Sequence, residues 1–300
     1  MPRGPSLSRR DLVAALSVAS VAALSGCTVR LEDGVTVPFQ ESAPPVPGGA
    51  GLAWLQADTR ALAAQAPGRG ALKAQLATVH AAQQDVLASA LAGLALPAPS
   101  TSPAPPSSPA ASKPAGPELA AYAAVADLVS VAVELRPLVC ALLAQRCAAA
   151  RLLGTPATLA DNVSAVEGPA LDQPVQRLAA TIFWMEVIAA RSSENQRALA
   201  LSTRDRLKAL LVAWAPAAPG FTPQLGYPLP APAQSAEQAR DLASTILRDL
   251  IASWGGAYAA STQARSGPAL RRLPLAVAVM DVEAYRWGAA LSPFPGLNTP

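Results

Sequence analysis

Apolar residues recur every three or four positions in several stretches of the chain, and this is the period of an amphipathic α-helix. No stretch shows the sustained alternation of apolar and polar residues that a half-buried strand requires. Residues 51–96 are predicted to form two helices, from Leu52 to about Ala66 and from Ala71 to Leu94. The apolar stripe expected on the second helix consists of Leu72, Leu76, Val79, Val86 and Ala90. The pattern predicts an all-α protein.

A third region of helical periodicity covers residues 118–154. We expect one long helix there, kinked at Pro137 because proline lacks the N–H of the helical ladder. Gly154 stands where a glycine commonly ends a helix. The preceding residues, 97–117, are rich in Pro, Ser and Ala and show no periodicity, so they are predicted to form an extended linker.

Residues 170–291 are predicted to contain four helices. The first runs from Leu171 to Arg191, and the second follows Ser193, which with Gln196 resembles a capping box, and ends at Trp214. A loop rich in Pro and Gly, 216–232, comes next.

The third of these helices is expected from Ser235, again in a capping box with Gln238, to about Ala260. The fourth begins at Gly267-Pro268, because proline is well tolerated at the first helical position. Its apolar residues alternate steps of three and four, which is typical of a bundle seam: Leu270, Leu273, Val277, Met280, Ala284, Trp287 and Leu291. Short connections on either side of one long loop favour an up-down four-helix bundle, preceded by an N-terminal helical region and followed by a tail, 292–300.

The N-terminus has the composition of an export signal. Residues 1–26 begin with a basic segment and continue with a mild apolar stretch, Leu12–Leu24, which is too short to span a bilayer comfortably. The run Leu24-Ser25-Gly26-Cys27 resembles a lipobox, which implies cleavage before Cys27 and diacylation of its sulfur. The alternative is a buried N-terminal helix with an incidental cysteine. Residues 27–50, rich in Pro and Gly, are predicted to be a disordered tether.

Paired arginines suggest a particular export route. Ser8-Arg9-Arg10-Asp11-Leu12 resembles a twin-arginine signal, through which a protein crosses the membrane already folded. Ordinary secretory signals also carry paired arginines, so both routes remain open. In either case the expected location is the outer face of the cytoplasmic membrane, held by two or three lipid chains rather than one.

Loss of the signal changes the charge of the chain. The whole sequence has 23 Lys+Arg and 20 Asp+Glu, and removal of three arginines and one aspartate with residues 1–26 leaves 20 against 19. The mature chain is therefore nearly neutral and has no basic stripe of the kind that binds nucleic acid.

Three segments of the C-terminal region together resemble an actinobacterial ferritin-like domain of unknown function that occurs in lipoproteins. They are the apolar first helix with its single acid, the loop 226–230 (GYPLP), and the ending 283–287 (EAYRW) followed by 293–297 (PFPGL). The resemblance covers residues 172–300 and implies a ferritin-like four-helix bundle. It implies no particular activity.

Ferritin-like di-iron sites use a Glu from each of two helices and a Glu-x-x-His from each of the other two. This sequence has one histidine, His80, outside the predicted bundle, and no Glu-x-x-His. What remains is a set of acids that could form an unusual carboxylate-only metal site. Glu186 is the only charge in an apolar stretch and is expected to face the bundle interior, as is Asp249, and Asp281 and Glu283 flank the apolar seam. A structural, hydrogen-bonded carboxylate is the alternative.

Other candidate groups are interpreted conservatively. His80 lies to the side of its helix stripe and is expected to be solvated. Cys140 and Cys147 share a helix face but lie about 10 Å apart along its axis, so two buried thiols are expected rather than a disulfide. Trp184, Trp214, Trp254 and Trp287 fall one per bundle helix and are expected to be core anchors, although they could also line a pocket.

Two functions are compatible with these observations. The first is a non-catalytic surface lipoprotein whose helical body binds an envelope protein, lipid or other ligand, without a cofactor. The second is a ferritin-like metalloprotein or oxidoreductase. No serine-nucleophile elbow, Cys/His pair or phosphate loop is present, so the sequence favours the first.

Overall fold

The structure is a computed structural model, and it describes residues 48–65, 70–94, 116–123, 128, 131–155, 168–263 and 267–297. The predicted signal peptide, Cys27 and nearly all of the predicted tether and 97–117 linker lie outside these ranges. Every regular element within them is helical, which confirms the all-α prediction. The longer helices are α2 (Gly49–Ala64), α3 (Ala71–Gly93), α6 (Arg136–Leu152), α7 (Asp172–Arg191), α8 (Glu194–Trp214), α9 (Ala236–Ser253), α10 (Gly255–Gln263) and α11 (Gly267–Arg286). Among these helices, none combines the length and the apolar character that crossing a bilayer requires.

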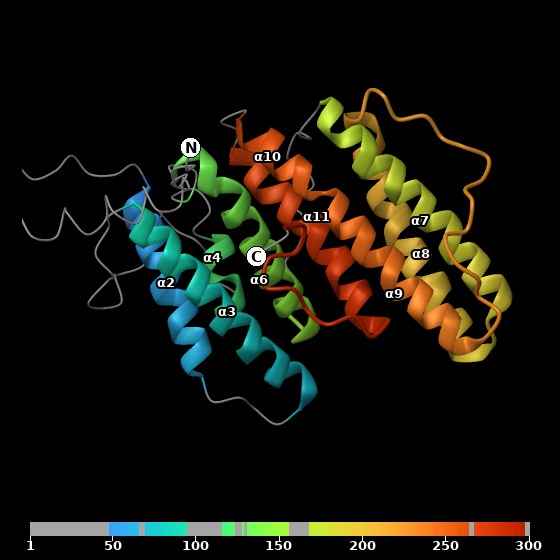
Figure 1. Cartoon of the computed structure of the whole chain (residues 1–300), viewed down its shortest axis with the longest axis horizontal. Coiled ribbons are helices and arrows are strands. Elements are labelled where there is room, and N and C mark those ends of the chain that lie inside the picture. Colours follow the sequence, from blue (N-terminus) through green and yellow to red (C-terminus); the bar gives the residue numbers. More distant parts are fainter. Residues whose placement is uncertain are drawn as a thin grey trace, which may run out of the picture. The chain divides into compact units, whose positions relative to one another are not determined.

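Helices α2 and α3 pack against each other as a hairpin (Figure 1). The buried stripe of α3 differs from the predicted one, because it includes polar residues that an apolar pattern overlooks. Its members are Leu76, Val79, His80, Gln83, Leu87 and Leu91. Val86, which was expected on the stripe, is only partly buried, and Leu87 beside it is fully buried.

The predicted single helix over 118–154 is wrong. The described part of this region contains two 3-10 turns, η1 (Pro117–Leu119) and η2 (Val133–Leu135), the short helix α4 (Ala120–Ala123), and α6. Pro137 lies in the first turn of α6 and therefore starts that helix, where its missing N–H has no partner to lose, instead of kinking a longer one. The end of α6 is as predicted: Gly154 has a φ of 87°, and Thr155 N–H donates to the Ala150 carbonyl at 2.8 Å.

In the C-terminal region the helix bounds agree closely with the prediction, but the details of capping do not. Ser235 caps α9 by accepting a hydrogen bond from the Gln238 N–H at 3.1 Å. Ser193 makes no such bond at α8, and the Gln196 side chain donates instead to the Ala236 carbonyl at 2.7 Å. The predicted capping box at Ser193 is therefore wrong.

The third bundle helix also ends earlier than predicted, at Ser253, and a separate helix, α10, begins at Gly255. The carbonyl of Gly296 lies against Gly255, in space that a side chain would occupy. The C-terminal segment thus packs against the break between α9 and α10, and its Phe294 is buried there in the main core.

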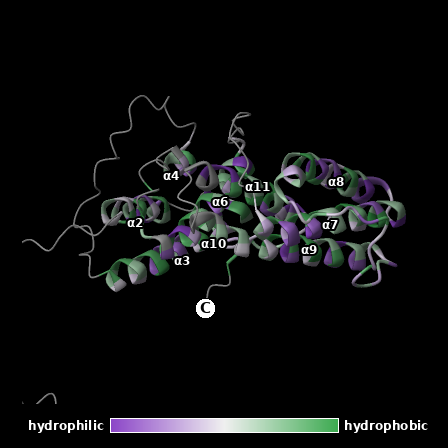
Figure 2. Ribbon diagram, turned by 90° about the horizontal axis from the view of Figure 1, so that it is seen from above, coloured by the Kyte–Doolittle hydropathy of each residue, from purple (hydrophilic) through white to green (hydrophobic). Residues whose placement is uncertain are grey.

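Helices α6 and α11 make the most extensive helix contact, α11 also packs on α9, and α7 lies against both α8 and α9 (Figure 1). The predicted seam is confirmed within α11, whose seam residues with described side chains are buried. The last two predicted members, Trp287 and Leu291, are also buried but lie beyond the end of the helix at Arg286. Both hydrophilic and hydrophobic residues occur along α7, α8 and α9, as expected for amphipathic helices (Figure 2). Residues from Leu52 on α2 to Phe294 belong to one hydrophobic core, so the N-terminal helices and the bundle form one compact unit within residues 45–300.

Candidate binding site

Two of the four predicted metal-ligand candidates are exposed. Glu186 forms an ion pair with Lys208 of α8, with 2.7 Å between Oε1 and Nζ, and Asp249 faces solvent on α9. The prediction that both point into the bundle is wrong. An isolated acid in an apolar stretch can still fall on the outward face of a helix, and the buried residues Ile182, Met185 and Ile188 place Glu186 beside, not within, the buried face.

Asp281 and Glu283 are both buried, but they do not form a common site. Being two positions apart on α11, they point in opposite directions. The Glu283 carboxylate accepts hydrogen bonds from Thr203 Oγ1 at 2.8 Å and from the guanidinium groups of Arg206 and Arg286 at 3.1 and 2.7 Å. This is a structural carboxylate that joins α8 to α11.

The Asp281 carboxyl group lies in the interior without comparable support. Its Oδ2 accepts no hydrogen bond from any described residue, and burial raises its pKa to about 7. The described residues contain no group of three or more His, Cys, Asp or Glu side chains arranged to hold a metal ion. The four predicted carboxylates therefore do not converge on a metal site.

His80 is buried, so its predicted solvation is wrong. Its Nε2 lies 3.4 Å from Glu118 Oε2, which is an electrostatic contact and not a well-formed hydrogen bond. The fully buried Arg146 donates from Nη1 to the same oxygen at 3.1 Å and from Nη2 to Thr59 Oγ1 at 2.9 Å. Burial raises the pKa of Glu118, but His80 and Arg146 lower it by more. We refer to Thr59, His80, Glu118 and Arg146 as the Arg146 cluster.

The Arg146 cluster joins α2, α3, η1 and α6. A second polar contact joins α3 and α6. The Gln83 side chain of α3 donates to the Gln145 side chain of α6 at 3.0 Å and to the Pro293 carbonyl at 2.8 Å. The sequence pattern alone does not mark these residues as a group. The available signal was the spacing of His80 and Gln83 between Leu76 and Leu87, which continues the buried stripe of α3.

The cysteines and tryptophans behave as predicted. Cys140 and Cys147 are free and buried, and burial raises the pKa of both thiols, that of Cys147 to about 12. Neither thiol is therefore an activated nucleophile. The four bundle tryptophans are buried, and the Trp214 and Trp254 rings meet edge to face with their centroids 5.1 Å apart.

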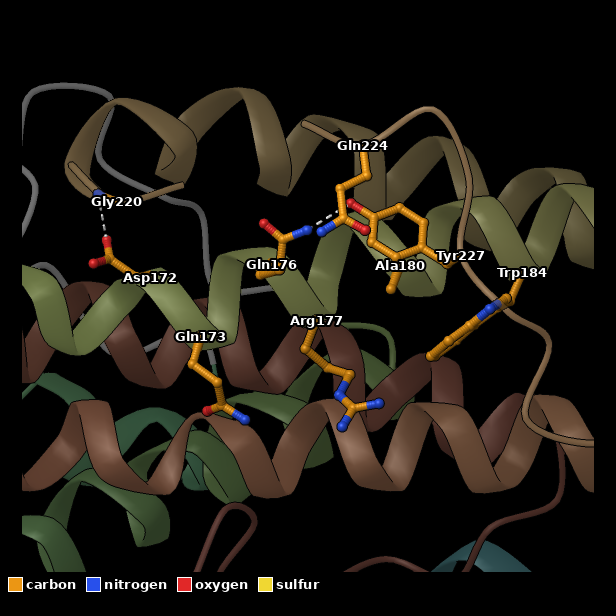
Figure 3. Close-up of a pocket in the computed structure, with 9 residues that line it drawn as sticks. All are labelled: Asp172, Gln173, Gln176, Arg177, Ala180, Trp184, Gly220, Gln224 and Tyr227. Carbon is orange, nitrogen blue, oxygen red and sulfur yellow. Dashed lines mark hydrogen bonds between the residues drawn. The ribbon is translucent and has the colours of Figure 1, made fainter. Parts of the chain in front are cut away.

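A pocket of about 500 Å³ lies along α7, beneath the segment that follows η4 (Ala215–Ala217). The nine residues that line it are labelled in Figure 3. Six of them come from α7, at intervals of one to four positions that place them along one side of the helix, and three, Gly220, Gln224 and Tyr227, come from the loop.

Hydrogen bonds fix the loop on α7. Asp172 Oδ1 accepts from the Gly220 N–H at 2.8 Å, and Gln176 Nε2 donates to the Tyr227 hydroxyl at 2.8 Å (Figure 3). Beyond them, Trp184 Nε1 donates to the Pro228 carbonyl at 3.1 Å. A side chain at position 220 would overlap the Asp172 carboxylate, which would then have to move from its place beside the Gly220 N–H. The pocket is thus held in shape by contacts at both ends.

Aromatic rings and one cation form the far end of the pocket. The Tyr227 ring meets Trp184 edge to face, with the centroids 6.5 Å apart, and the Arg177 guanidinium carbon lies 5.9 Å from the centre of the Trp184 ring. Within the described chain Arg177 forms no ion pair with a carboxylate. The pocket lining contains no serine, cysteine or histidine, and it includes three side-chain amides, those of Gln173, Gln176 and Gln224.

The pocket lies entirely within one region that is similar to a known family. Residues 170–299 match a domain of unknown function (DUF4439). The matched region contains α7 to α11 and the loop over the pocket, whereas the α2–α3 hairpin and α6 precede it. No curated protein and no solved structure matches the chain.

Proposed function

We propose that this chain is an exported actinobacterial lipoprotein, held at the outer face of the cytoplasmic membrane by lipid on Cys27, whose ferritin-like helical bundle is a non-catalytic binding module. The observation that carries the binding role is the pocket along α7. Its volume of about 500 Å³ lies within the range of about 300–1,000 Å³ that is usual for small-ligand sites.

The pocket favours binding over catalysis because of the groups that line it. Amides and aromatic rings bind and orient a ligand, whereas proton transfer requires a titratable group in contact with the reacting atoms. The one acid of the lining, Asp172, accepts a hydrogen bond from the Gly220 N–H. The one cation, Arg177, lies over the Trp184 ring. The described bundle carboxylates face different directions, so the proposal includes no metal centre.

The anchoring half of the proposal is tested by Cys27→Ala. In the producing cell the variant should lose the lipid, as shown by the mass of the N-terminal peptide, and should leave the membrane fraction. Cys140→Ala is the matched control, since it removes a cysteine that is not in the lipobox, and it should stay in the membrane. A Cys27→Ala protein that is cleaved normally and remains in the membrane would contradict the anchoring proposal.

The binding half is tested by thermal melting of the full chain, purified in detergent, with and without an extract of the cell envelope. A ligand that binds the folded state raises the melting temperature. The extract should raise that of the wild type and not that of Tyr227→Ala. An equal response of the two proteins, or none, would contradict a binding role for this pocket.

A further inference from the structure

We propose that the pocket along α7 takes a carbohydrate chain of the cell envelope, an inference that rests on the binding role proposed above. The chemistry of the lining, its balance of charge and the way its loop is held each bear on the class of ligand.

The apolar part of the lining is aromatic. Tyr227 supplies a partly exposed ring, the Trp184 ring behind it is buried, and Ala180 is the one aliphatic side chain among the lining residues. An acyl chain is held by flexible aliphatic side chains that close around it, and these are missing from this lining. A sugar ring presents a flat face of C–H groups, which packs against the face or edge of an aromatic ring.

Three of the polar side chains in the lining are amides. Gln173, Gln176 and Gln224 each carry two N–H donors and one carbonyl acceptor. A hydroxyl group is also donor and acceptor at once, so a row of amides matches neighbouring hydroxyls whichever way their protons point. Gln173 and Gln224 are exposed, and no hydrogen bond of either is found within the described chain. Their bonding capacity is therefore available to a ligand.

The charges of the lining select against strongly ionic ligands. It contains one acid and one base, Asp172 and Arg177, which lie five positions apart on α7 and so about 7.5 Å apart along the helix axis. A phosphate or polyanion is normally held by several cations or by backbone N–H groups together with a cation. Here the single guanidinium, that of Arg177, lies over the Trp184 ring. Its N–H groups can donate to a hydroxyl group or to the carboxylate of an acidic sugar.

The loop over the pocket is held in a way that suits this ligand. The Gln176–Tyr227 and Trp184–Pro228 hydrogen bonds fix the ring of Tyr227 before a ligand arrives. A preformed aromatic surface lowers the entropy cost of binding, and that cost weighs heavily for a weakly held, hydrated ligand such as a sugar.

The test is ligand-observed NMR of the full chain, purified in detergent, against trisaccharides of glucose, galactose, mannose and N-acetylglucosamine. At least one should bind wild type. Tyr227→Ala should weaken that binding about tenfold or more, because it removes the main aromatic surface. Triglycine and dodecanoate are the comparison probes for peptide and lipid, and both should bind more weakly than that sugar.

Gln173→Ala tests the amides without disturbing the loop, since this exposed side chain makes no hydrogen bond to it. It should weaken sugar binding several-fold while the melting temperature stays unchanged. Gln65→Ala is the matched control, an exposed glutamine at the end of α2, and should bind as wild type does.

The inference is overturned if none of the four trisaccharides binds, if a sugar binds Tyr227→Ala and Gln173→Ala as tightly as wild type, or if dodecanoate or triglycine is the tighter ligand. Stabilisation by the envelope extract that depends on Tyr227, combined with no sugar binding, would reject the carbohydrate and leave the binding module standing. Failure of both experiments would reject the module itself.

Discussion

The contact between the α2–α3 hairpin and α6 differs in kind from the interior of the bundle. The hairpin meets α6 partly through buried charges and amides, the Arg146 cluster and the Gln83–Gln145 pair. Apolar side chains accompany them, including Leu76 and Val79 of α3, which cluster with Ala149 of α6. Around α7, α9 and α11 the interior is mostly apolar. Its ionic contact, the Glu283 network, pairs a buried carboxylate with two partly exposed arginines. The two regions belong to one core, but buried polar groups contribute more to the hairpin contact, and apolar packing contributes more to the bundle interior.

The difference predicts how each region tolerates change. An apolar core loses stability in proportion to the volume removed, because its stability is the sum of many contacts that each contribute little energy. A buried charge cluster loses much more when one member is removed, because its partners are then left unpaired in a medium of low polarity. Among the described residues, buried polar atoms without a hydrogen-bond partner occur in both regions: on Gln83, Gln145 and Arg146 at the hairpin contact, and on Trp254 and Asp281 in the bundle.

The largest effect is expected from Arg146→Met. Glu118 would keep its burial without its guanidinium partner, so the free energy of unfolding should fall by about 3–5 kcal/mol. Adding Glu118→Leu removes the stranded charge and should recover most of the loss. Urea denaturation of the single and double variants measures both, and a double variant less stable than Arg146→Met would show that the cluster is not the ionic unit described here.

Leu247→Ala probes the apolar region. Leu247 of α9 is fully buried in the main core, and its truncation should cost about 2–5 kcal/mol, according to how far the neighbours relax into the space. Leu247→Met keeps the volume and should cost less than about 1.5 kcal/mol. Thermal and urea denaturation should rank the two in that order. Equal losses would mean that this position is limited by shape, not by volume.

Asp281→Asn probes the one fully buried acid of α11 without an ion pair among the described residues. Burial in the folded state raises the pKa of the Asp281 carboxyl from 3.8 to about 7. The folded protein therefore holds this proton more tightly than the unfolded chain does. Stability is therefore full below pH 4 and declines as the pH rises toward 7, by at most roughly 4 kcal/mol. The Asn variant should lose that decline and be more stable than wild type at pH 7.5, by about 2 kcal/mol since its amide also lacks partners. Melting curves from pH 4 to 8 check this, and a parallel decline in both proteins would assign the pH dependence to another group.

The smallest effect is expected at Glu186. Its ion pair with Lys208 is about half-exposed on both sides, and such pairs contribute roughly 0–1 kcal/mol. Glu186→Gln should therefore change the melting temperature little, with or without a chelator. Glu283→Gln is the contrasting variant, because its buried carboxylate accepts from two arginines, and it should be clearly less stable. A chelator-dependent loss at Glu186 would return it to the role of a metal ligand.

Local signals were enough to predict most of the helices. The bounds of α3, α7 and α8 and the start of α11 could be read from apolar period, proline and glycine, because these act within a few residues of the chain. The seam of α11 and the two separate thiols followed from the same geometry. The break at Gly255 was not predicted, although the pair Gly255-Gly256 is a local signal for it. The contact of the Gly296 carbonyl with Gly255 is distant in sequence and could not be predicted.

The placement of polar groups shows where local reasoning ends. Glu186 was expected inside and lies outside, whereas His80 was expected outside and lies inside. An acid in an apolar stretch can be buried or exposed, and so can a histidine beside an apolar stripe. The helical period alone does not say which other helices cover these positions. The packing of other helices decides it: the exposed Glu186 pairs with Lys208 of α8, and the buried His80 lies beside Glu118, which Arg146 also contacts.

The sequence by itself determined the all-α class, the main helices and the residues that form the bundle seam, because each depends on spacing within a single segment. Tertiary structure alone decided that α6 packs on α11, that the hairpin is joined through the Arg146 cluster, and that the loop after η4 lies over α7 to form the pocket. These are contacts between residues far apart in the chain. Their energy comes from mutual burial and pairing, which exist only once the helices are assembled.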